Sequence, residues 1–477
     1  METGVWVGIA LSLHYALQIA VLIRALSRPD REPASRVAWV LVILGLPAVG
    51  IVLYLALGEV SPGRRQVARM RAVRQALPVK VPGQEPAALP APARAAFGRG
   101  ASVNGFAPVG GNRARLAADA DQAMAGIVAD IDAARESVHI LVYIWLDDTN
   151  GRALMAALAR AAARGVPCRA MVDGLGSRKV LKSAGWAAMK AAGVKTGIAF
   201  DTRWAAARLL LGRIDIRNHR KIFVIDGRIA WCGSQNCADP AFLPKARFAP
   251  WVDIMLRIEG PVAWQTQALF AADWMGQGGD DIAPLLTGAP EAVPGGFPAL
   301  AVGTGPDLSA NAVPDMVALL LAAAQREVVI STPYFVPTQG LDEAIRATAL
   351  RGVAVTLILP ARNDSRMVAW ASRSTYGGLL KAGVALHEFQ PGLLHAKTLT
   401  VDGGLALIGS ANLDRRSFEL NFENVMLIAD APTAGLIRER QADYLAQSRP
   451  VTAAEVTGWR LPKRLLHNAA AIVSPIL

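Results

Sequence analysis

The sequence HRKIFVIDGRIAWCGSQN at residues 219–236 decides the fold, because the same pattern returns as HAKTLTVDGGLALIGSAN at residues 395–412. Both copies contain His-x-Lys-x-x-x-x-Asp and end in Gly-Ser-x-Asn, with the same spacing from the His to the final Asn. The repeated residues are His219, Lys221 and Asp226 in the first copy and His395, Lys397 and Asp402 in the second. A lone His near a Lys is usually a surface residue, but two copies in one register predict duplicated units that share a function.

The chemistry of the pattern indicates a phosphate substrate. Side chains alternate between the faces of a β-strand, so each His is expected beside its Lys on one face. A phosphodiester needs cations on its non-bridging oxygens, an attacking group and a proton donor for the leaving oxygen. Two facing copies would provide all three, and we expect neither a metal nor another cofactor. Further hydrogen bonds to the phosphate are predicted from the side chains that close each motif, namely Ser234, Asn236, Ser410 and Asn412.

The duplication extends beyond the motifs. Strand-like runs at 138–145 and 328–335 are each followed by a helical stretch, a further strand and a second helix. Alternating strands and helices in both halves predict an α/β fold with two α/β/α units. We expect the halves to pack as a pseudo-twofold dimer within one chain, with the motif strands near the axis. The first half has an insertion at about 201–214, which is either a lipid-facing lip or an ordinary surface helix.

Composition divides the chain further. We predict a two-helix membrane anchor over 1–60 and a basic, then Ala/Pro-rich linker over 61–110. Because prolines recur between Leu77 and Gly100, that stretch is expected to be a semi-extended tether. The body would comprise a first domain at 111–286, a crossover rich in Gly, Pro and Ala at 287–306, and a second domain at 307–477.

The N-terminal anchor is predicted from two apolar segments. Residues 4–23 and 37–57 are each about long enough to cross a bilayer of roughly 30 Å at about 1.5 Å per residue. A cleaved signal peptide is less favoured because Met1-Glu2-Thr3 contains no basic residue. A buried helical hairpin is the remaining alternative to two transmembrane helices. Arginines flank both ends of the second segment, so the positive-inside rule leaves the membrane side open.

The charge balance favours an anionic partner. The chain has 50 Lys and Arg against 38 Asp and Glu, for a net charge of +12. Arginines gather between Arg64 and Arg74, just past the predicted anchor, where they would gain from anionic headgroups. Nucleic acid is not expected as a partner because no basic stripe is interleaved with aromatic residues. The three cysteines, Cys168, Cys232 and Cys237, are expected to be buried free thiols.

At the two motifs the chain resembles the phospholipase D superfamily, whose members pair two such motifs in one site. Four stretches are similar to bacterial cardiolipin synthases: IRNHRK at 216–221, STPYFVP at 331–337, QPGLLHAK at 390–397 and GSANLDRRSFELNFE at 409–423. The similarity covers nearly the whole chain. It implies a multi-pass enzyme of the bacterial inner membrane that acts on phosphatidylglycerol and other phospholipids. It does not indicate an oligomeric state.

The resemblance also implies roles for individual residues. One His would attack phosphorus to form a phosphohistidine, and the other would protonate the departing alcohol. We assign the attack to His219 and the proton transfer to His395. Asp253 and Glu423 resemble the family carboxylates that orient the imidazoles, while Asp226 and Asp402 are grouped with the catalytic residues although turn formation is a rival explanation.

These roles describe a phosphatidyltransferase that makes cardiolipin from phosphatidylglycerol and releases glycerol. The alternatives are a phospholipase D-type hydrolase, a membrane-tethered nuclease or phosphodiesterase, and a non-catalytic lipid-binding scaffold. One departure from the family pattern is the segment FLPKARF at 242–248, after which the chain reads Trp-Val-Asp where the family has Trp-Arg-Asp. That segment bears on the choice of lipid more than on the transfer chemistry.

Overall fold

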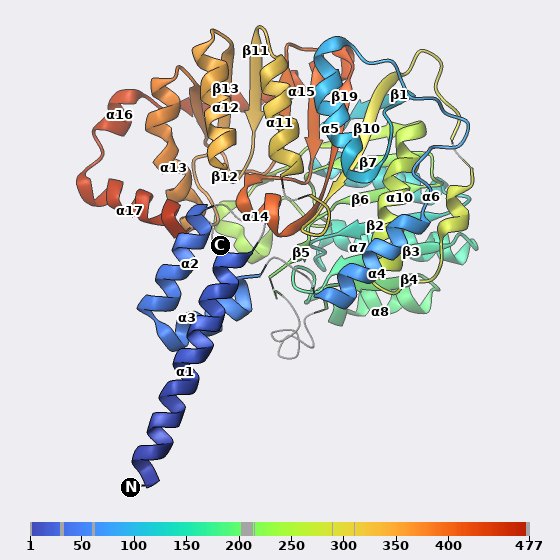
Figure 1. The fold of residues 1–477 in the computed structure, drawn as a ribbon. Helices are drawn as coiled ribbons and strands as arrows, with labels where there is room; N and C mark the ends of the chain where they lie inside the picture. Colours follow the sequence, from blue (N-terminus) through green and yellow to red (C-terminus); the bar gives the residue numbers. More distant parts are fainter. Residues whose placement is uncertain are drawn as a thin grey trace.

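The computed structural model describes residues 2–28, 33–59, 63–201, 213, 215–288, 290–309 and 311–473. Figure 1 shows an α/β body from one side of which the N-terminal helices project. Except for Asp201 and Arg213, the predicted insertion at 201–214 lies outside the described residues.

The first α/β unit alternates strands and helices, as the sequence pattern predicts. Its helices begin at residues that cap them: Asp119 accepts a hydrogen bond from Gln122 N, and Asp148 accepts one from Gly151 N. The elements in chain order are β1 (Val109–Leu116), α6 (Ala120–Ala133), β2 (Val138–Val142), α7 (Thr149–Ala163), β3 (Cys168–Asp173), η2 (Val180–Lys182), α8 (Ala184–Ala191), β4 (Lys195–Ala199), β5 (Arg217–Asn218), β6 (Ile222–Ile225), β7 (Ile229–Gly233), η4 (Leu243–Phe248), β8 (Trp251–Val252), β9 (Met255–Glu259), α10 (Pro261–Gly276) and η5 (Ala283–Leu286).

The second unit repeats this order and adds a C-terminal extension. Its helices α12 and α13 also begin at capping residues, Thr338 and Ser365. The elements are β10 (Phe297–Thr304), α11 (Ala312–Ala323), β11 (Glu327–Ser331), β12 (Phe335–Val336), α12 (Gln339–Leu350), β13 (Ala354–Pro360), α13 (Arg366–Lys381), β14 (Ala385–Phe389), β15 (Leu393–Leu394), β16 (Thr398–Val401), β17 (Leu405–Gly409), β18 (Leu413–Asp414), α14 (Arg415–Glu419), β19 (Asn421–Ala429), α15 (Ala431–Ala446), β20 (Ser448–Pro450), α16 (Ala453–Thr457) and α17 (Leu461–Val473).

One 16-stranded sheet runs through both units. From one edge its order is β20-β14-β13-β11-β16-β17-β19-β10-β1-β9-β7-β6-β2-β3-β4, with β5 attached to β19. Apart from the additional edge strand β20, corresponding strands follow in the same order outward from the β10–β1 contact in each direction, and these two strands pair antiparallel. The prediction of two α/β units related by a pseudo-twofold axis is therefore confirmed. The domain boundaries stay a prediction, and β10 lies inside the proposed crossover.

The N-terminal helices differ from the predicted pair of spans. Among the described residues, Thr3–Ser27 in α1 (Glu2–Ser27) is the one helix long and apolar enough to cross a membrane. The second apolar segment is divided into α2 (Pro33–Gly45) and α3 (Pro47–Leu57), which pack against each other as a hairpin. Pro47 causes the break, because a proline lacks an N–H and clashes with the preceding turn of a helix. The expectation of one continuous second span is wrong, and a multi-pass topology stays a prediction.

The predicted linker is largely folded onto the body. Helix α4 (Arg64–Ala76) packs against α10, and its Met70 is 1% exposed. Helix α5 (Arg94–Asn104) packs on β10 and α11 and buries Phe97 completely. The tether prediction is wrong from Pro90 onward, because the prolines there lie before or within the first turn of a short η1 helix (Ala91–Ala93), where a missing N–H is tolerated.

Candidate active site

Each repeated motif forms the same hairpin, and this geometry explains its aspartate. Strands β6 and β7 are joined by a tight turn at Asp226 and Gly227, whose φ angles are 52° and 61°. Strands β16 and β17 are joined by Asp402 and Gly403, with φ angles of 51° and 66°. Two successive positive φ angles define a turn in which Asp-Gly is a favoured pair.

The two aspartates stabilise neighbouring loops rather than the site. The Asp226 carboxylate accepts hydrogen bonds from three successive backbone N–H groups beginning at Arg135, and the Asp402 carboxylate does the same for three beginning at Gln325. Asp226 follows the end of β6 and Asp402 follows the end of β16, whereas the motif His precedes the start of the same strand. The structure therefore favours the turn explanation for Asp226 and Asp402, and their grouping with the catalytic residues stays a prediction that their position does not support.

Short parallel strand pairs bring each imidazole to the opposite unit. Strand β5 pairs with the start of β19, so Asn218 lies beside Phe422 and the next residues, His219 and Glu423, face each other. Strand β15 pairs with β8 in the same way, which sets His395 beside Asp253. His219 and Lys221 lie in the segment between β5 and β6, so the prediction that a strand presents them is wrong, although each His remains beside its Lys.

The first dyad joins an imidazole that is 11% exposed to a fully buried carboxylate. His219 Nδ1 lies 2.9 Å from both Oε1 and Oε2 of Glu423. The carboxylate also accepts hydrogen bonds from Ser410 Oγ at 2.5 Å and from Asn421 Nδ2 at 3.2 Å. The Glu423 side chain has no exposed surface. With its Nδ1–H held by this carboxylate, the imidazole directs Nε2 away from the dyad.

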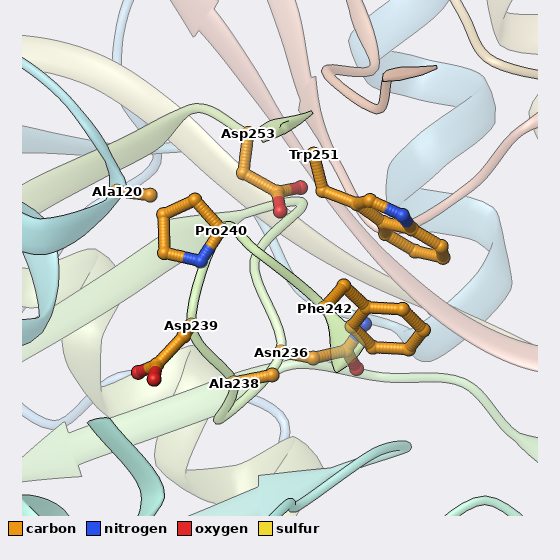
Figure 2. A pocket seen from close by; sticks show the side chains of 8 residues that line it. All are labelled: Ala120, Asn236, Ala238, Asp239, Pro240, Phe242, Trp251 and Asp253. Atoms are coloured by element: carbon orange, nitrogen blue, oxygen red, sulfur yellow. The ribbon is translucent and has the colours of Figure 1, made fainter. Parts of the chain in front are cut away.

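The second dyad is similar, but here the imidazole is more buried, at 4% exposed, and the carboxylate is less buried. His395 Nδ1 lies 2.6 Å from Asp253 Oδ1, and Ser234 Oγ donates to the same oxygen at 2.6 Å. The Asp253 side chain is 8% exposed. It also borders the small pocket in Figure 2, where its carboxylate lies between the Pro240 ring and the Trp251 indole. The aspartate, whose side chain is shorter than that of Glu423, therefore contacts its imidazole through one carboxylate oxygen.

The two lysines lie beside their histidines as expected. Lys221 Nζ donates to His219 O at 2.8 Å, and Lys397 Nζ donates to His395 O at 2.6 Å. Burial lowers the pKa of Lys221 to about 8 and that of Lys397 to about 7, although nearby carboxylates oppose the shift. Two buried cations with one backbone bond each can still donate to a phosphate oxygen, since an ammonium group has three N–H donors.

Burial also sets the charge state of the imidazoles. It lowers the pKa of His219 to about 4, against the opposing effect of Glu423, and it lowers the pKa of His395 with help from Lys397. Burial would raise the pKa of Asp253, but its contacts with His395 and Lys397 lower it to about 2. At neutral pH both imidazoles are therefore neutral and Asp253 is ionised, which leaves an Nε2 lone pair available for attack.

Both histidines open into one cleft of about 640 Å³ that is built from the two units. Its wall includes Asn236 and Asn412, and cations contributed by both units. The segment 242–248 forms η4 at the rim, where Lys245 pairs with Asp364 of the second unit. The cleft therefore has the size and charge for an anionic headgroup, and η4 connects its two sides.

The side chains that close each motif differ in what they contact, and their phosphate contacts stay a prediction. The hydroxyls of Ser234 and Ser410 donate to Asp253 and Glu423, and each also accepts a backbone N–H, so they are engaged with the carboxylates. Because one hydroxyl has a single proton to donate, this arrangement favours a carboxylate-positioning role, and direct phosphate donation by the two serines stays a prediction. Asn236 accepts a hydrogen bond from Ile144 N through Oδ1, which leaves its amide NH₂ for the cleft.

Several residues at the site were not found from the sequence. Tyr143 packs its ring edge against His219 with centroids 5.0 Å apart, and the Trp251 ring lies 4.7 Å from that of His395. Arg220 is buried and donates to Asp273, Glu423 O and Thr304 O, and so joins the two units. Arg220 lies inside the motif, but the second copy has Ala396 there, so the repeat gives no signal for it.

Neither metal nor thiol chemistry is indicated by the described residues. They contain no group of three or more His, Cys, Asp or Glu side chains arranged to hold a metal ion, and the expectation of a metal-free site stays a prediction. The three cysteines are free and buried, as predicted. Burial raises the pKa of Cys168 to about 11, so this thiol stays protonated at neutral pH.

The duplicated units and their shared pair of imidazoles define the class of this protein, the phospholipase D superfamily. A family model described as "Cardiolipin synthase, PLD-like domain" matches residues 127–274 and 317–443, one segment in each unit. A second family model, described as "Phospholipase_D-nuclease N-terminal", matches residues 16–59. The chain belongs to the cardiolipin synthase family, and the resemblance read from its motifs is confirmed.

Named relatives support the same conclusion. The chain is 35% identical to Cardiolipin synthase A of Cronobacter sakazakii over 98% of its length and 97% of that protein. It is also 35% identical to Cardiolipin synthase A of Citrobacter koseri, over 97% of both chains. A crystal structure of phosphatidylserine synthase from Haemophilus influenzae has a TM-score of 0.57 at 15% identity, covering 86% of this chain and all of that one, which shows the fold alone. The chain is an enzyme of the cardiolipin synthase family.

Proposed function

We propose that this protein is a membrane-bound phosphatidyltransferase that makes cardiolipin from two molecules of phosphatidylglycerol and releases glycerol. The observation that carries the proposal is the facing pair of imidazole–carboxylate dyads, His219–Glu423 and His395–Asp253, in one cation-lined cleft. Family membership supports the choice of substrate and product.

The first half-reaction would form a covalent intermediate. His219 Nε2 attacks the phosphorus of the donor, a P–N bond forms and the P–O bond to the glycerol headgroup breaks. His395 transfers its Nε2 proton to the departing glycerol oxygen. The lowered pKa of His219 supports its assignment as the nucleophile, because attack requires a neutral imidazole.

The second half-reaction reverses these roles with another alcohol. The hydroxyl of a second phosphatidylglycerol gives its proton to His395 and attacks phosphorus, the P–N bond breaks and cardiolipin leaves. Each cycle returns both imidazoles to their starting state. His395 must carry a proton in the first step, and the anionic phosphate would raise its pKa above that of the empty site.

Positive side chains would hold the phosphate in both steps. Lys221 and Lys397 are each beside one imidazole and would donate to the non-bridging oxygens, while the amide groups of Asn236 and Asn412 would add neutral donors. Ser234 and Ser410 would act through the carboxylates that they contact. Helix α1 supports attachment to the bacterial inner membrane.

Labelled phosphatidylglycerol supplied to the detergent-purified protein tests the proposal. Mass spectrometry should find cardiolipin and free glycerol, and both products should disappear with His219→Ala and with His395→Ala. Phosphatidic acid as the sole lipid product would instead establish a phospholipase D-type hydrolase. No product with the wild-type protein would contradict the proposal.

Trapping separates the roles of the two histidines. After a denaturing quench at neutral pH, which preserves the acid-labile P–N bond, the His395→Ala protein should retain the labelled phosphatidyl group from a substrate whose leaving group needs no protonation. The His219→Ala protein should retain none. Label on His219→Ala and none on His395→Ala would reverse the assignment.

A further inference from the structure

Helix α17 carries an apolar surface that nothing in the described chain covers. Ten large hydrophobic side chains outside α1–α3 are strongly exposed in the described part of the chain, and α17 contributes four of them. They are Leu461, Leu465, Leu466 and Ile472, with exposed fractions of 65%, 58%, 43% and 71%. Such a concentration on one helix marks an interaction surface.

The exposed apolar residues form a second face of the helix. Its inner face packs on α13 through His467 and Ala470, which are each 3% exposed. At 3.6 residues per turn, Leu461, Leu465 and Ile472 lie together on the side directly opposite to these two. The outer face, named here the α17 face, therefore consists of side chains that do not help the helix to pack on its own unit.

The position and charge of the α17 face indicate what covers it. In Figure 1, α17 lies along the edge of the body from which α1–α3 project, and it runs crosswise to α1. A helix crosswise to a membrane span lies parallel to the membrane plane. The exposed Arg464 flanks the face, and the exposed Arg460 directly precedes the helix, so basic side chains suited to anionic headgroups lie beside the apolar residues.

We propose that α17 is an interfacial membrane helix, whose outer leucines and isoleucine insert at the boundary between headgroups and acyl chains of an anionic bilayer. With α1 it would give the body two separate membrane contacts. A single flexible attachment would allow the body to tilt, whereas two contacts hold the cleft at one orientation to the lipid surface.

A fluorescent label tests this contact without relying on the proposed function. The three native cysteines are buried, so a bimane dye attached to Leu465→Cys would report that position alone. The control is Leu350→Cys. Leu350 is 72% exposed and lies shortly before the start of β13, at the end of the parallel strands that faces away from the cleft. In phosphatidylglycerol vesicles, brominated lipids should quench the dye at 465 and not at 350.

Two outcomes would overturn the proposal. One is equal quenching, or none, at both positions. The other is a disulfide-linked dimer through Leu465→Cys in dilute vesicles, which would assign the α17 face to a second copy of the chain.

Turnover provides a second readout, which rests on the proposed function. The double variant Leu461→Asp/Leu465→Asp should lose about tenfold or more in activity on vesicles, since two apolar side chains lose their burial. Its activity in detergent micelles, where lipids reach the cleft freely, should be unchanged, as should that of Leu350→Asp in both. Equal losses of the double variant in vesicles and micelles would contradict a role in docking.

Discussion

The two dyads arise from one repeated motif, yet the structure makes them unequal. Glu423 holds His219 through two carboxylate oxygens and is sealed from solvent, whereas Asp253 holds His395 through one oxygen and borders a small pocket. The longer carboxylate also receives Asn421 in addition to a serine. A duplicated sequence can therefore supply two different environments, because each dyad takes its carboxylate from the other unit.

That inequality suits the two chemical roles. A nucleophile has to stay neutral with one fixed tautomer, which the contact of His219 with both oxygens of the buried Glu423 favours. A group that gives and takes protons has to change its charge during the cycle, and the single-oxygen contact of His395 with the partly exposed Asp253 is better suited to this change.

The largest expected effect comes from altering the two carboxylates. In Glu423→Gln the amide can donate to His219 Nδ1, which moves the imidazole proton to Nε2 and removes the attacking lone pair, so kcat should fall about 10³-fold. Asp253→Asn should cost about 10²-fold. It should also shift the alkaline limb of the pH profile to lower pH, because the carboxylate that raises the pKa of His395 is lost. Equal losses with identical pH profiles would mean that the dyads are equivalent.

A smaller effect is expected from the two lysines as pH rises. Burial lowers the pKa of Lys397 to about 7 and that of Lys221 to about 8, so Lys397 loses its charge first. KM for phosphatidylglycerol should rise about tenfold between pH 7 and pH 9, since charge-assisted hydrogen bonds to the phosphate are lost. The test is KM in mixed micelles at constant ionic strength.

Single variants sharpen the lysine comparison. Lys397→Met should remove the part of the KM rise near pH 7, and Lys221→Met should remove the part near pH 8. A KM that does not change with pH in the wild-type enzyme would show that the lysines do not contact the phosphate in their charged forms.

The smallest effect is expected from the turn aspartates. Asp226→Asn and Asp402→Asn keep a residue that tolerates a positive φ but weaken the hydrogen bonds to three backbone N–H groups, so each should lower the free energy of unfolding by about 1 kcal/mol. The activity per folded molecule should not change. Thermal unfolding and kcat measured on the same samples decide the question, and a large loss of kcat with unchanged stability would restore the catalytic assignment.

The main features of the fold could be read from local pattern. Equal spacing from His219 to Asn236 and from His395 to Asn412 predicts the duplication, and the alternation of strand-like and helical segments predicts both α/β units. Local pattern gives the wrong answer at two groups of prolines. The prolines near residue 90 predict a tether, yet they lie just before α5 in the structure, and the apolar composition of residues 37–57 predicts one span although Pro47 divides it.

The motif, its repetition and the expectation of phosphate chemistry can be read from the sequence, because they depend on residue type and short spacing. Which carboxylate meets which imidazole follows from the packing of the two units, since it depends on pairing between β5 and β19 and between β8 and β15, which are distant along the chain. The same packing places the serines against the carboxylates and Asp226 and Asp402 in turns. These outcomes follow from how the two units pack across the pseudo-twofold axis, and short-range spacing contains no information about that packing.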